Sequence, residues 1–249
     1  MKLRTLVIFI FCFAQLFSLE LIEKFEVKIT YISLPMATVE INLSENDSVK
    51  TISVNAFSKG MFTAFYKINN QYLSICEKDF QTIRYEKNIL QGDFEEKKLI
   101  SFNTKNFYIK SQNLLNETKN FITYFENFDK IFNIFSALFY IRFNSKKDTN
   151  TIFCFANQEI WSVKYSYFSE EELSFSDKKY PTKKYIVEFE NVSKNSSSRT
   201  DILTNNLFSE ENQIILWFSD DEQHLPIKAK YVMSPFSIYW HLDEYWHKD

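Results

Sequence analysis

The sequence predicts a mainly β fold, in which one apolar helix is buried against a curved antiparallel sheet. Apolar and polar residues alternate along most of the chain, which is the period of a strand with one buried face. Short polar turns separate the alternating runs, as expected for hairpins. Residues 128–143 do not alternate and are apolar almost throughout, which indicates a buried helix.

The strands follow from the alternating runs in chain order. The runs are Phe25–Tyr31, Val39–Leu43, Ile52–Ala56, Trp161–Tyr167, Tyr185–Phe189, Ile214–Phe218, Pro226–Met233 and Ile238–Leu242. The polar turns are expected at Glu45–Ser48, Asn69–Gln71, Gln91–Asp93, Asn103–Lys105 and Ser219–Leu225. Residues 191–209 lack a sustained period, so we expect a mobile loop there.

The helix predicted over Phe128–Phe143 has a signal at each end. Asp129 can accept hydrogen bonds from the free amides of the first turn, and Arg142 suits the negative end of the helix dipole. Apolar side chains cover nearly every face between them, so this helix should be buried, and it is too short to cross a bilayer. A shorter helix is expected near Gly60–Phe65.

Residues 1–18 have the pattern of a secretory signal peptide. Lys2 and Arg4 precede an unbroken apolar run, Leu6–Phe13. A membrane anchor that stays attached is the alternative, but Gln15 interrupts the apolar stretch before it reaches a spanning length. We therefore expect export to the periplasm with cleavage, and a mature chain that is not an integral membrane protein.

The mature chain, residues 19–249, is expected to form a single β-rich domain. The full chain has 29 Lys+Arg against 32 Asp+Glu, and loss of the two N-terminal cations changes the net charge from -3 to -5. This balance argues against nucleic acid as a partner and against an anionic membrane surface as the main partner. Cys76 and Cys154 remain, either as a disulfide or as two separate buried thiols.

The sequence contains no motif that predicts catalysis, a metal or a cofactor. His224, His241 and His247 are not spaced as a metal-binding pair, and the chain lacks a glycine-rich phosphate loop. Adjacent acids such as Asp220 and Asp221 more often bind the amides of their own turn than a cation. Asn42 lies in a segment that resembles the bacterial N-glycosylation sequon. A non-enzymatic role is therefore favoured, with no cofactor expected.

Three segments together resemble one protein family. They are Phe57–Asn70 with Gly60 and Tyr66, Asp129–Arg142, and Trp217–Pro226 with Asp220 and Asp221. They resemble the exported bacterial domain of unknown function numbered 3108, in which these positions are expected to be structural. The resemblance implies an envelope-associated protein with a strongly curved antiparallel sheet, an open or partial barrel, wrapped around one buried helix. That shape is similar to exported lipid and lipoprotein carriers.

The leading functional hypothesis is a non-enzymatic periplasmic protein that binds an apolar, lipid-like ligand between the helix and the sheet. The expected lining residues are Phe132, Phe135, Leu138 and Phe139. The alternative is a structural or scaffolding protein of envelope assembly that acts through contacts with other proteins. That alternative predicts an exposed apolar patch or an unpaired sheet edge. A hydrolase would require a cleft that brings the histidines together.

Overall fold

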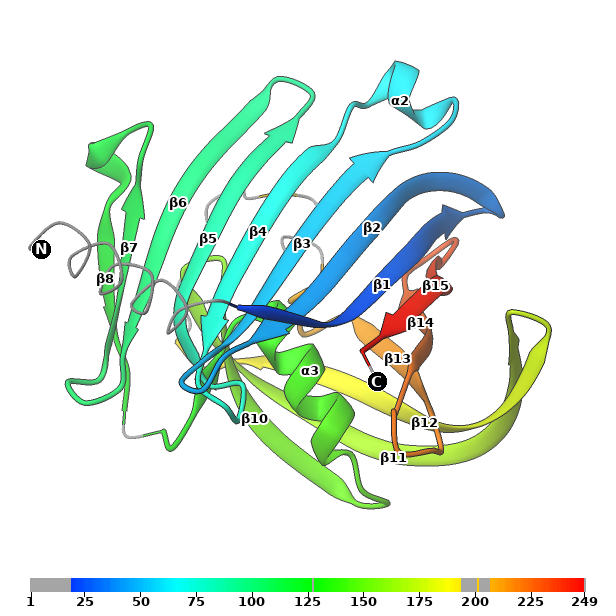
Figure 1. Cartoon of the computed structure of the whole chain (residues 1–249). Coiled ribbons are helices and arrows are strands. Elements are labelled where there is room, and N and C mark those ends of the chain that lie inside the picture. The colour runs from blue at the N-terminus through cyan, green and yellow to red at the C-terminus, as the bar shows by residue number, and fades with distance from the viewer. Residues whose placement is uncertain (1–18, 127, 194–200, 202–206, 249) are drawn as a thin grey trace, which may run out of the picture.

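The computed structural model describes residues 19–126, 128–193, 201 and 207–248, and Figure 1 shows its arrangement. The prediction of a mainly β fold is confirmed. A single fifteen-stranded sheet contains every described strand, in the order β8-β7-β6-β5-β4-β3-β2-β1-β15-β14-β13-β12-β11-β10-β9. Neighbouring strands run antiparallel except β9 and β10, which are parallel. The chain therefore forms a meander whose C-terminal strand, β15, pairs with its first strand, β1.

The described elements have the following bounds. The strands are β1 Glu20–Tyr31, β2 Leu34–Glu45, β3 Lys50–Ser58, β4 Asn69–Cys76, β5 Thr82–Gln91, β6 Phe94–Asn103, β7 Tyr108–Asn113, β8 Phe121–Tyr124, β9 Ile131–Phe132, β10 Thr149–Ala156, β11 Glu159–Phe175, β12 Lys178–Asn191, β13 Gln213–Ser219, β14 Pro226–Val232 and β15 Ile238–His247. The helices are α2 Phe62–Phe65, the 3-10 turn Glu117–Lys119 and α3 Ile134–Asn144.

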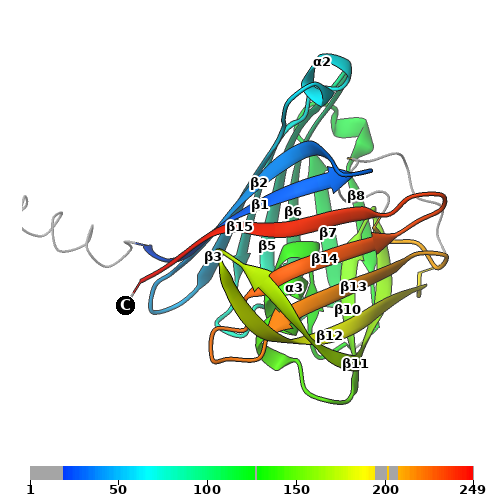
Figure 2. The same ribbon diagram turned by 90° about the vertical axis from the view of Figure 1, so that its right-hand side faces the viewer.

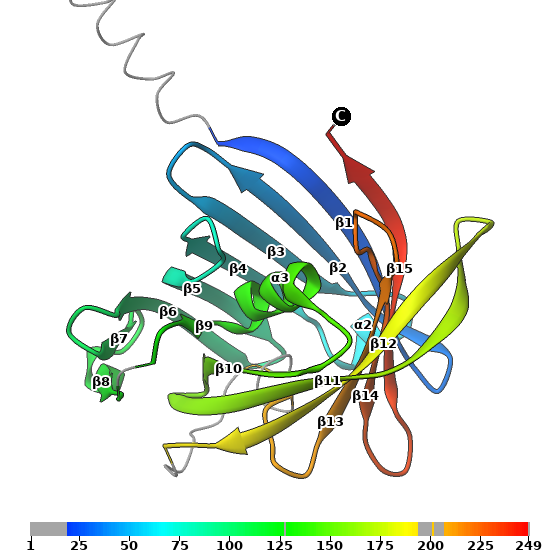
Figure 3. The same ribbon diagram turned by 90° about the horizontal axis from the view of Figure 1, so that it is seen from below.

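The sheet curves but does not close, because β8 and β9 at its two edges do not pair with each other. The chain runs from one edge to the other between residues 124 and 131. Aromatic side chains bring the edges together, since the Phe121 and Phe155 ring centroids are 6.3 Å apart and those of Phe128 and Phe153 are 3.8 Å apart. Seen from below, α3 lies inside the concave side of this open barrel (Figure 3).

The alternation of the sequence decides which side chains enter the barrel. Phe25 and Val27 of β1 are buried, whereas Lys24 and Lys28 on either side of them are exposed. On the next strand Ile41 and Leu43 are likewise buried. Because successive strand residues point to opposite faces, these apolar side chains face the interior, whereas Lys24 and Lys28 face solvent.

The prediction that Asp129 caps the central helix is wrong. The helix begins at Ile134 with Asn133 as its N-cap, because the Asn133 side chain accepts from the amides of Phe135 and Ser136, while the Ser136 hydroxyl accepts from the Asn133 amide. Ile131 and Phe132 form β9 instead and pair with β10. The helix is also not buried on every face as expected, since Phe143 at its C-terminal end is exposed.

Two further expectations for chain segments have different outcomes. The short helix expected near Gly60 is confirmed as α2, but the turn expected at Asn69–Gln71 is wrong because these residues begin β4. The turn precedes them, where Gly60 adopts a positive φ of 59°. The expected signal peptide, residues 1–18, and most of the expected mobile loop, residues 194–200 and 202–206, lie outside the described residues.

The two cysteines within the described residues are free and buried, Cys76 on β4 and Cys154 on β10. Of the two alternatives for these thiols, the structure therefore has the separate buried pair. Burial raises the pKa of the Cys76 thiol to about 12 and raises that of Cys154 as well.

Candidate functional site

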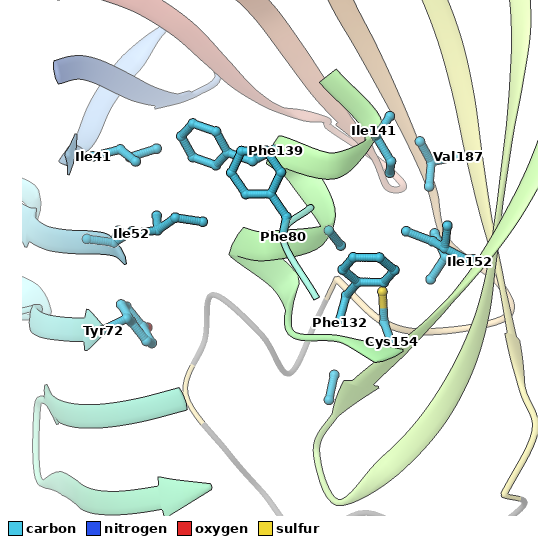
Figure 4. Packing of buried hydrophobic residues seen from close by; sticks show 14 of the residues in the cluster. Ile41, Ile52, Tyr72, Phe80, Phe132, Phe139, Ile141, Ile152, Cys154 and Val187 are labelled. Atoms are coloured by element: carbon cyan, nitrogen blue, oxygen red, sulfur yellow. The ribbon is translucent and has the colours of Figure 1, made fainter. Parts of the chain in front are cut away.

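Aromatic side chains of α3 occupy the space between the two walls of the curved sheet. The Phe139 ring stacks on Phe80 at 5.6 Å and meets Phe25 edge-on at 6.0 Å. Phe135 contacts Tyr72 at 5.0 Å and Tyr85 at 6.3 Å. Figure 4 shows Phe80 and Phe139 facing the wall that carries Ile41 and Ile52, while Ile141 faces Val187 and Ile152. The helix is therefore packed from both sides.

This packing fills the place where a ligand was expected. The hollow beside Leu138 and Phe139 has a volume of about 10 Å³ and is also lined by Phe25, Ile41 and Trp240. About 10–15 Å³ is needed to hold even one water molecule. Phe132 and Phe139 are buried, and Phe135 and Leu138 are half-buried against the core. The four residues expected to line a ligand site thus contact other side chains of the protein.

A buried polar cluster fixes the N-terminal end of α3 to β4 and β5. The Ser74 hydroxyl donates to Asn133 Oδ1 at 3.1 Å, and the Asn133 amide donates to Thr82 Oγ1 at 2.8 Å. The hydroxyls of Thr82 and Ser136 are 2.8 Å apart. Because all four residues are almost completely buried, each of these hydrogen bonds compensates for a lost contact with water.

A buried ion pair fixes the other end of the helix. Arg142 is 1% exposed and donates from both terminal nitrogens to the carboxylate of Glu23 on β1, at 2.6 and 2.8 Å. Its Nε donates to the backbone carbonyls of His224 and Gln223. The Tyr245 hydroxyl donates to the same carboxylate at 3.0 Å, and burial beside Glu23 raises the pKa of this tyrosine. Arg142 therefore joins α3 to β1, to β15 and to the β13–β14 turn.

The acidic residues of the β13–β14 turn hold the turn itself. Asp221 Oδ1 accepts from the amides of Gln223 and His224 and from the Ser219 hydroxyl. Asp220 pairs with Lys183, which lowers the pKa of its carboxyl group. With the turn held this way, the carbonyls of residues 223 and 224 point at Arg142.

The other motif positions lie in the strands and turns around this centre. Trp217 of β13 is buried, with its indole NH bonded to Glu171, and Pro226 begins β14. The Tyr66 ring lies over Gly92, where an added Cβ atom would be 3.3 Å from it.

A second group of buried polar side chains lies on β5–β7. Lys98 pairs with Glu96 at 2.5 Å, and Lys87 pairs with Asp201. Burial lowers the pKa of Lys98. The adjoining hollow measures about 20 Å³ and is lined partly by both lysines, Tyr85 and Ser111, a volume suited to about one water molecule.

The candidate catalytic residues are not brought together. His224 lies on the β13–β14 turn, and His241 and His247 lie on β15 with their side chains exposed. Within the described ranges, no group of His, Cys, Asp and Glu side chains has the geometry of a metal site. A search of the same residues for a helix long and apolar enough to cross a membrane gives none. Asn42 is half-buried within β2, and its side-chain amide donates to Ser53.

One rim of the barrel exposes large apolar side chains, a feature that sequence reasoning missed. In an antiparallel meander alternate turns lie at the same edge, so the β14–β15, β1–β2 and β3–β4 turns are neighbours (Figures 1 and 2). We call five exposed apolar residues in and beside these turns the apolar rim: Ile32, Leu34, Met61, Phe65 and Phe236, which are 52%, 62%, 77%, 85% and 49% exposed.

Contacts between the three turns place the residues of the apolar rim on neighbouring segments. The Tyr31 and Phe236 rings meet at 6.1 Å, joining the β1–β2 and β14–β15 turns. The amide of Lys59 donates to the carbonyl of Met36 at 2.9 Å, joining the segment that carries α2 to β2. Exposed apolar patches of this kind mark surfaces that contact a partner.

The backbone of the β1–β2 turn gives a second reason to regard the apolar rim as functional. Ile32 and Ser33 both have positive φ values, 50° and 61°, as in the two-residue turns that favour Asn and Gly. A β-branched residue in this region costs roughly 1–2 kcal/mol. The hairpin turn between β11 and β12, at the opposite edge, has the polar pair Ser176–Asp177 at similar φ values. Ile32 is thus both strained and exposed, so an isoleucine at this position benefits neither the stability of the fold nor its solubility.

Comparison with known proteins gives a family and a fold. A family model described as "Protein of unknown function (DUF3108)" matches residues 24–236. The crystal structure of a beta-barrel-like protein of domain of unknown function DUF1849 from Brucella abortus is similar, with a TM-score of 0.58, 6% identity, and 92% of this chain and 98% of that chain covered. At this identity the likeness shows the fold alone.

A second solved structure is more distant. It is described as a putative lipoprotein from Parabacteroides distasonis, and it aligns with a TM-score of 0.36 and 10% identity over 90% of this chain and 95% of that chain. A TM-score this low does not support a common fold. No curated protein matches the chain.

Proposed function

The chain belongs to the DUF3108 family of proteins of unknown function, and we propose that it is an exported envelope protein that acts by docking through its apolar rim. The observation that carries this proposal is the set of exposed apolar side chains on three neighbouring turns, from Phe236 to Phe65. In this proposal α3 is a structural plug around which the sheet curves. The role is non-enzymatic and periplasmic, as a scaffold or adaptor of the cell envelope.

The packing of the interior favours docking over binding of an apolar ligand between α3 and the sheet. A lipid chain needs a cavity of a few hundred Å³, whereas the hollow beside Phe139 measures about 10 Å³. To open that space α3 would have to leave the Asn133 cluster at one end and Glu23 at the other. Separating the buried Arg142–Glu23 pair alone costs about 3–5 kcal/mol.

Photo-cross-linking in the bacterium that makes the protein tests the proposal. A photoreactive phenylalanine analogue replaces Phe65 on the apolar rim, and a matched variant carries it at Phe107, an exposed residue of the β6–β7 turn at the opposite edge. We expect an adduct with another envelope component from position 65 and little from position 107. Equal yields at the two positions, or no adduct at position 65, would overturn the docking proposal.

Native mass spectrometry of the protein purified from its own cells tests the competing ligand hypothesis. The docking proposal predicts the mass of the polypeptide alone, because the interior is already filled. A lipid bound in stoichiometric amount, and lost when Leu138 is replaced by Trp to fill the neighbouring space, would favour the carrier instead.

A further inference from the structure

The three turns that form the apolar rim are unusual in their charge as well as their apolarity. Acidic residues outnumber basic ones in the whole chain, 32 to 29, and this balance alone led us to expect no anionic membrane surface as the main partner. Residues 27–39, 51–76 and 227–240, which contain the three turns and their flanking strands, nevertheless contain no Asp or Glu. Their charged residues are Lys28, Lys59, Lys67, Lys228 and Lys230. We infer that the partner of the apolar rim is the surface of a lipid bilayer containing anionic phospholipid, an inference that rests on the proposed docking function.

Lysines lie directly behind the apolar tips. Lys59 and Lys67 flank α2 and are exposed, and the Lys59 ammonium lies 5.2 Å from the centre of the Phe57 ring. Lys230 on β14 lies 5.7 Å from the Tyr239 ring. The long lysine stem can lie along apolar surface while its ammonium reaches a phosphate at the depth of the lipid headgroups. This arrangement combines apolar insertion with attraction to anionic lipid.

Tyrosines lie at the same level as these lysines. Tyr31 ends β1, Tyr66 follows α2, and Tyr239 lies near the start of β15, each half-buried. Tyr31 contacts Phe236, and Tyr66 contacts Phe62 at 6.2 Å. Tyrosine is enriched where protein crosses from hydrocarbon to the headgroup layer, because its ring is apolar and its hydroxyl is polar. The order from tip to strand is therefore apolar, then tyrosine and lysine, as interfacial binding requires.

The geometry favours a deformable lipid surface over a folded protein partner. The apolar side chains protrude from three separate turns, and neither of the two hollows described above is lined by a residue of the apolar rim. A folded partner would have to supply a pocket for each tip, whereas a fluid interface adapts to all of them. Acidic residues flank the apolar rim, with Asp93 on the β5–β6 turn and Glu211 before β13, so the basic surface is confined to it.

The inference is tested with an environment-sensitive fluorophore on the apolar rim. In the full chain carrying Cys12→Ser, Phe65→Cys is labelled with a nitrobenzoxadiazole dye. Cys76 and Cys154 are 0% and 1% exposed, so the dye reacts at position 65. Because residues 6–13 are apolar and could enter lipid themselves, the readout is the emission of this dye and not bulk binding. Vesicles contain phosphatidylcholine alone or with phosphatidylglycerol in equal parts.

We expect a blue shift with the anionic vesicles and a much smaller one with phosphatidylcholine alone. Replacing Lys59, Lys67 and Lys230 together by Gln should raise the lipid concentration for half response roughly 100-fold, the fold-change that about 1 kcal/mol per lysine gives. The matched control replaces three exposed lysines of the opposite edge by Gln, namely Lys105, Lys146 and Lys178. This triple variant should change the lipid concentration for half response less than about threefold.

No blue shift with anionic vesicles, or equal effects of the two lysine sets, would overturn the lipid inference. If anionic vesicles cause no blue shift while position 65 still cross-links to a protein in cells, the docking function stands and its partner is a protein. If both measurements fail, the docking function falls with the lipid inference.

Discussion

Replacing Glu23 by Ala is the substitution with the largest expected effect on stability. It leaves the Arg142 guanidinium, 1% exposed, without its counter-charge and removes two hydrogen bonds of 2.6 and 2.8 Å. Each charge-assisted hydrogen bond contributes about 1.5–3 kcal/mol, and breaking a buried pair from one side costs about 3–5 kcal/mol. We expect the free energy of unfolding to fall by about 4 kcal/mol, with a fall in Tm of roughly 10 °C.

Urea-induced unfolding, followed by tryptophan fluorescence, measures this change. The control is Asp243→Ala, which breaks the solvent-exposed Lys28–Asp243 pair of 2.6 Å in the same part of the sheet and should lose less than about 1 kcal/mol. The double variant Glu23→Leu/Arg142→Met should lose less than Glu23→Ala alone, because no unpaired charge stays buried. If Glu23→Ala lost no more than Asp243→Ala, the assignment of this pair as the anchor of α3 would be refuted.

Three further outcomes are expected. Asn133→Ala removes the capping box of α3 and should lower the free energy of unfolding by about 1–2 kcal/mol in urea titrations, and an unchanged midpoint would count against the cap. Ile32→Asn should raise the free energy of unfolding by roughly 1 kcal/mol, since Asn tolerates a positive φ, while weakening the vesicle response at position 65; a loss of stability would contradict the strain argument. At pH 9 the thiols of Cys76 and Cys154 should react with iodoacetamide only after unfolding, because burial raises both pKa values, and rapid labelling of the native protein would show that they are accessible.

The strands were predictable because the alternation of apolar and polar residues that identifies a strand lies within the strand itself. Alternation over Phe25–Tyr31 or Ile52–Ala56 indicates a strand with one buried face, and no distant residue is needed to recognise it. The start of α3 was not predictable from the same signals. Asp129 and Asn133 are both suitable caps, and the choice depends on Thr82, which is far away in sequence and binds Asn133.

The candidate site was predictable only in part. The sequence indicated that Arg142 and the turn containing Asp221 belong to one family pattern. It did not indicate that they meet, because Arg142 reaches the carbonyls of this turn only in the folded chain, where Glu23 of β1 neutralises its charge. The apolar rim was missed because Ile32 and Phe65 occur in short apolar stretches that are typical of core. Their exposure depends on which turns the sheet places side by side.

Hydrogen exchange on the purified protein, with and without membranes from its source organism, tests docking through the apolar rim most directly. We predict that protection increases at residues 59–68, around α2, and at the β1–β2 turn, while the amides of α3, Ile134–Asn144, exchange at an unchanged rate. A change confined to α3, with residues 59–68 unaffected, would show that the interior opens to a ligand and would contradict docking through the apolar rim.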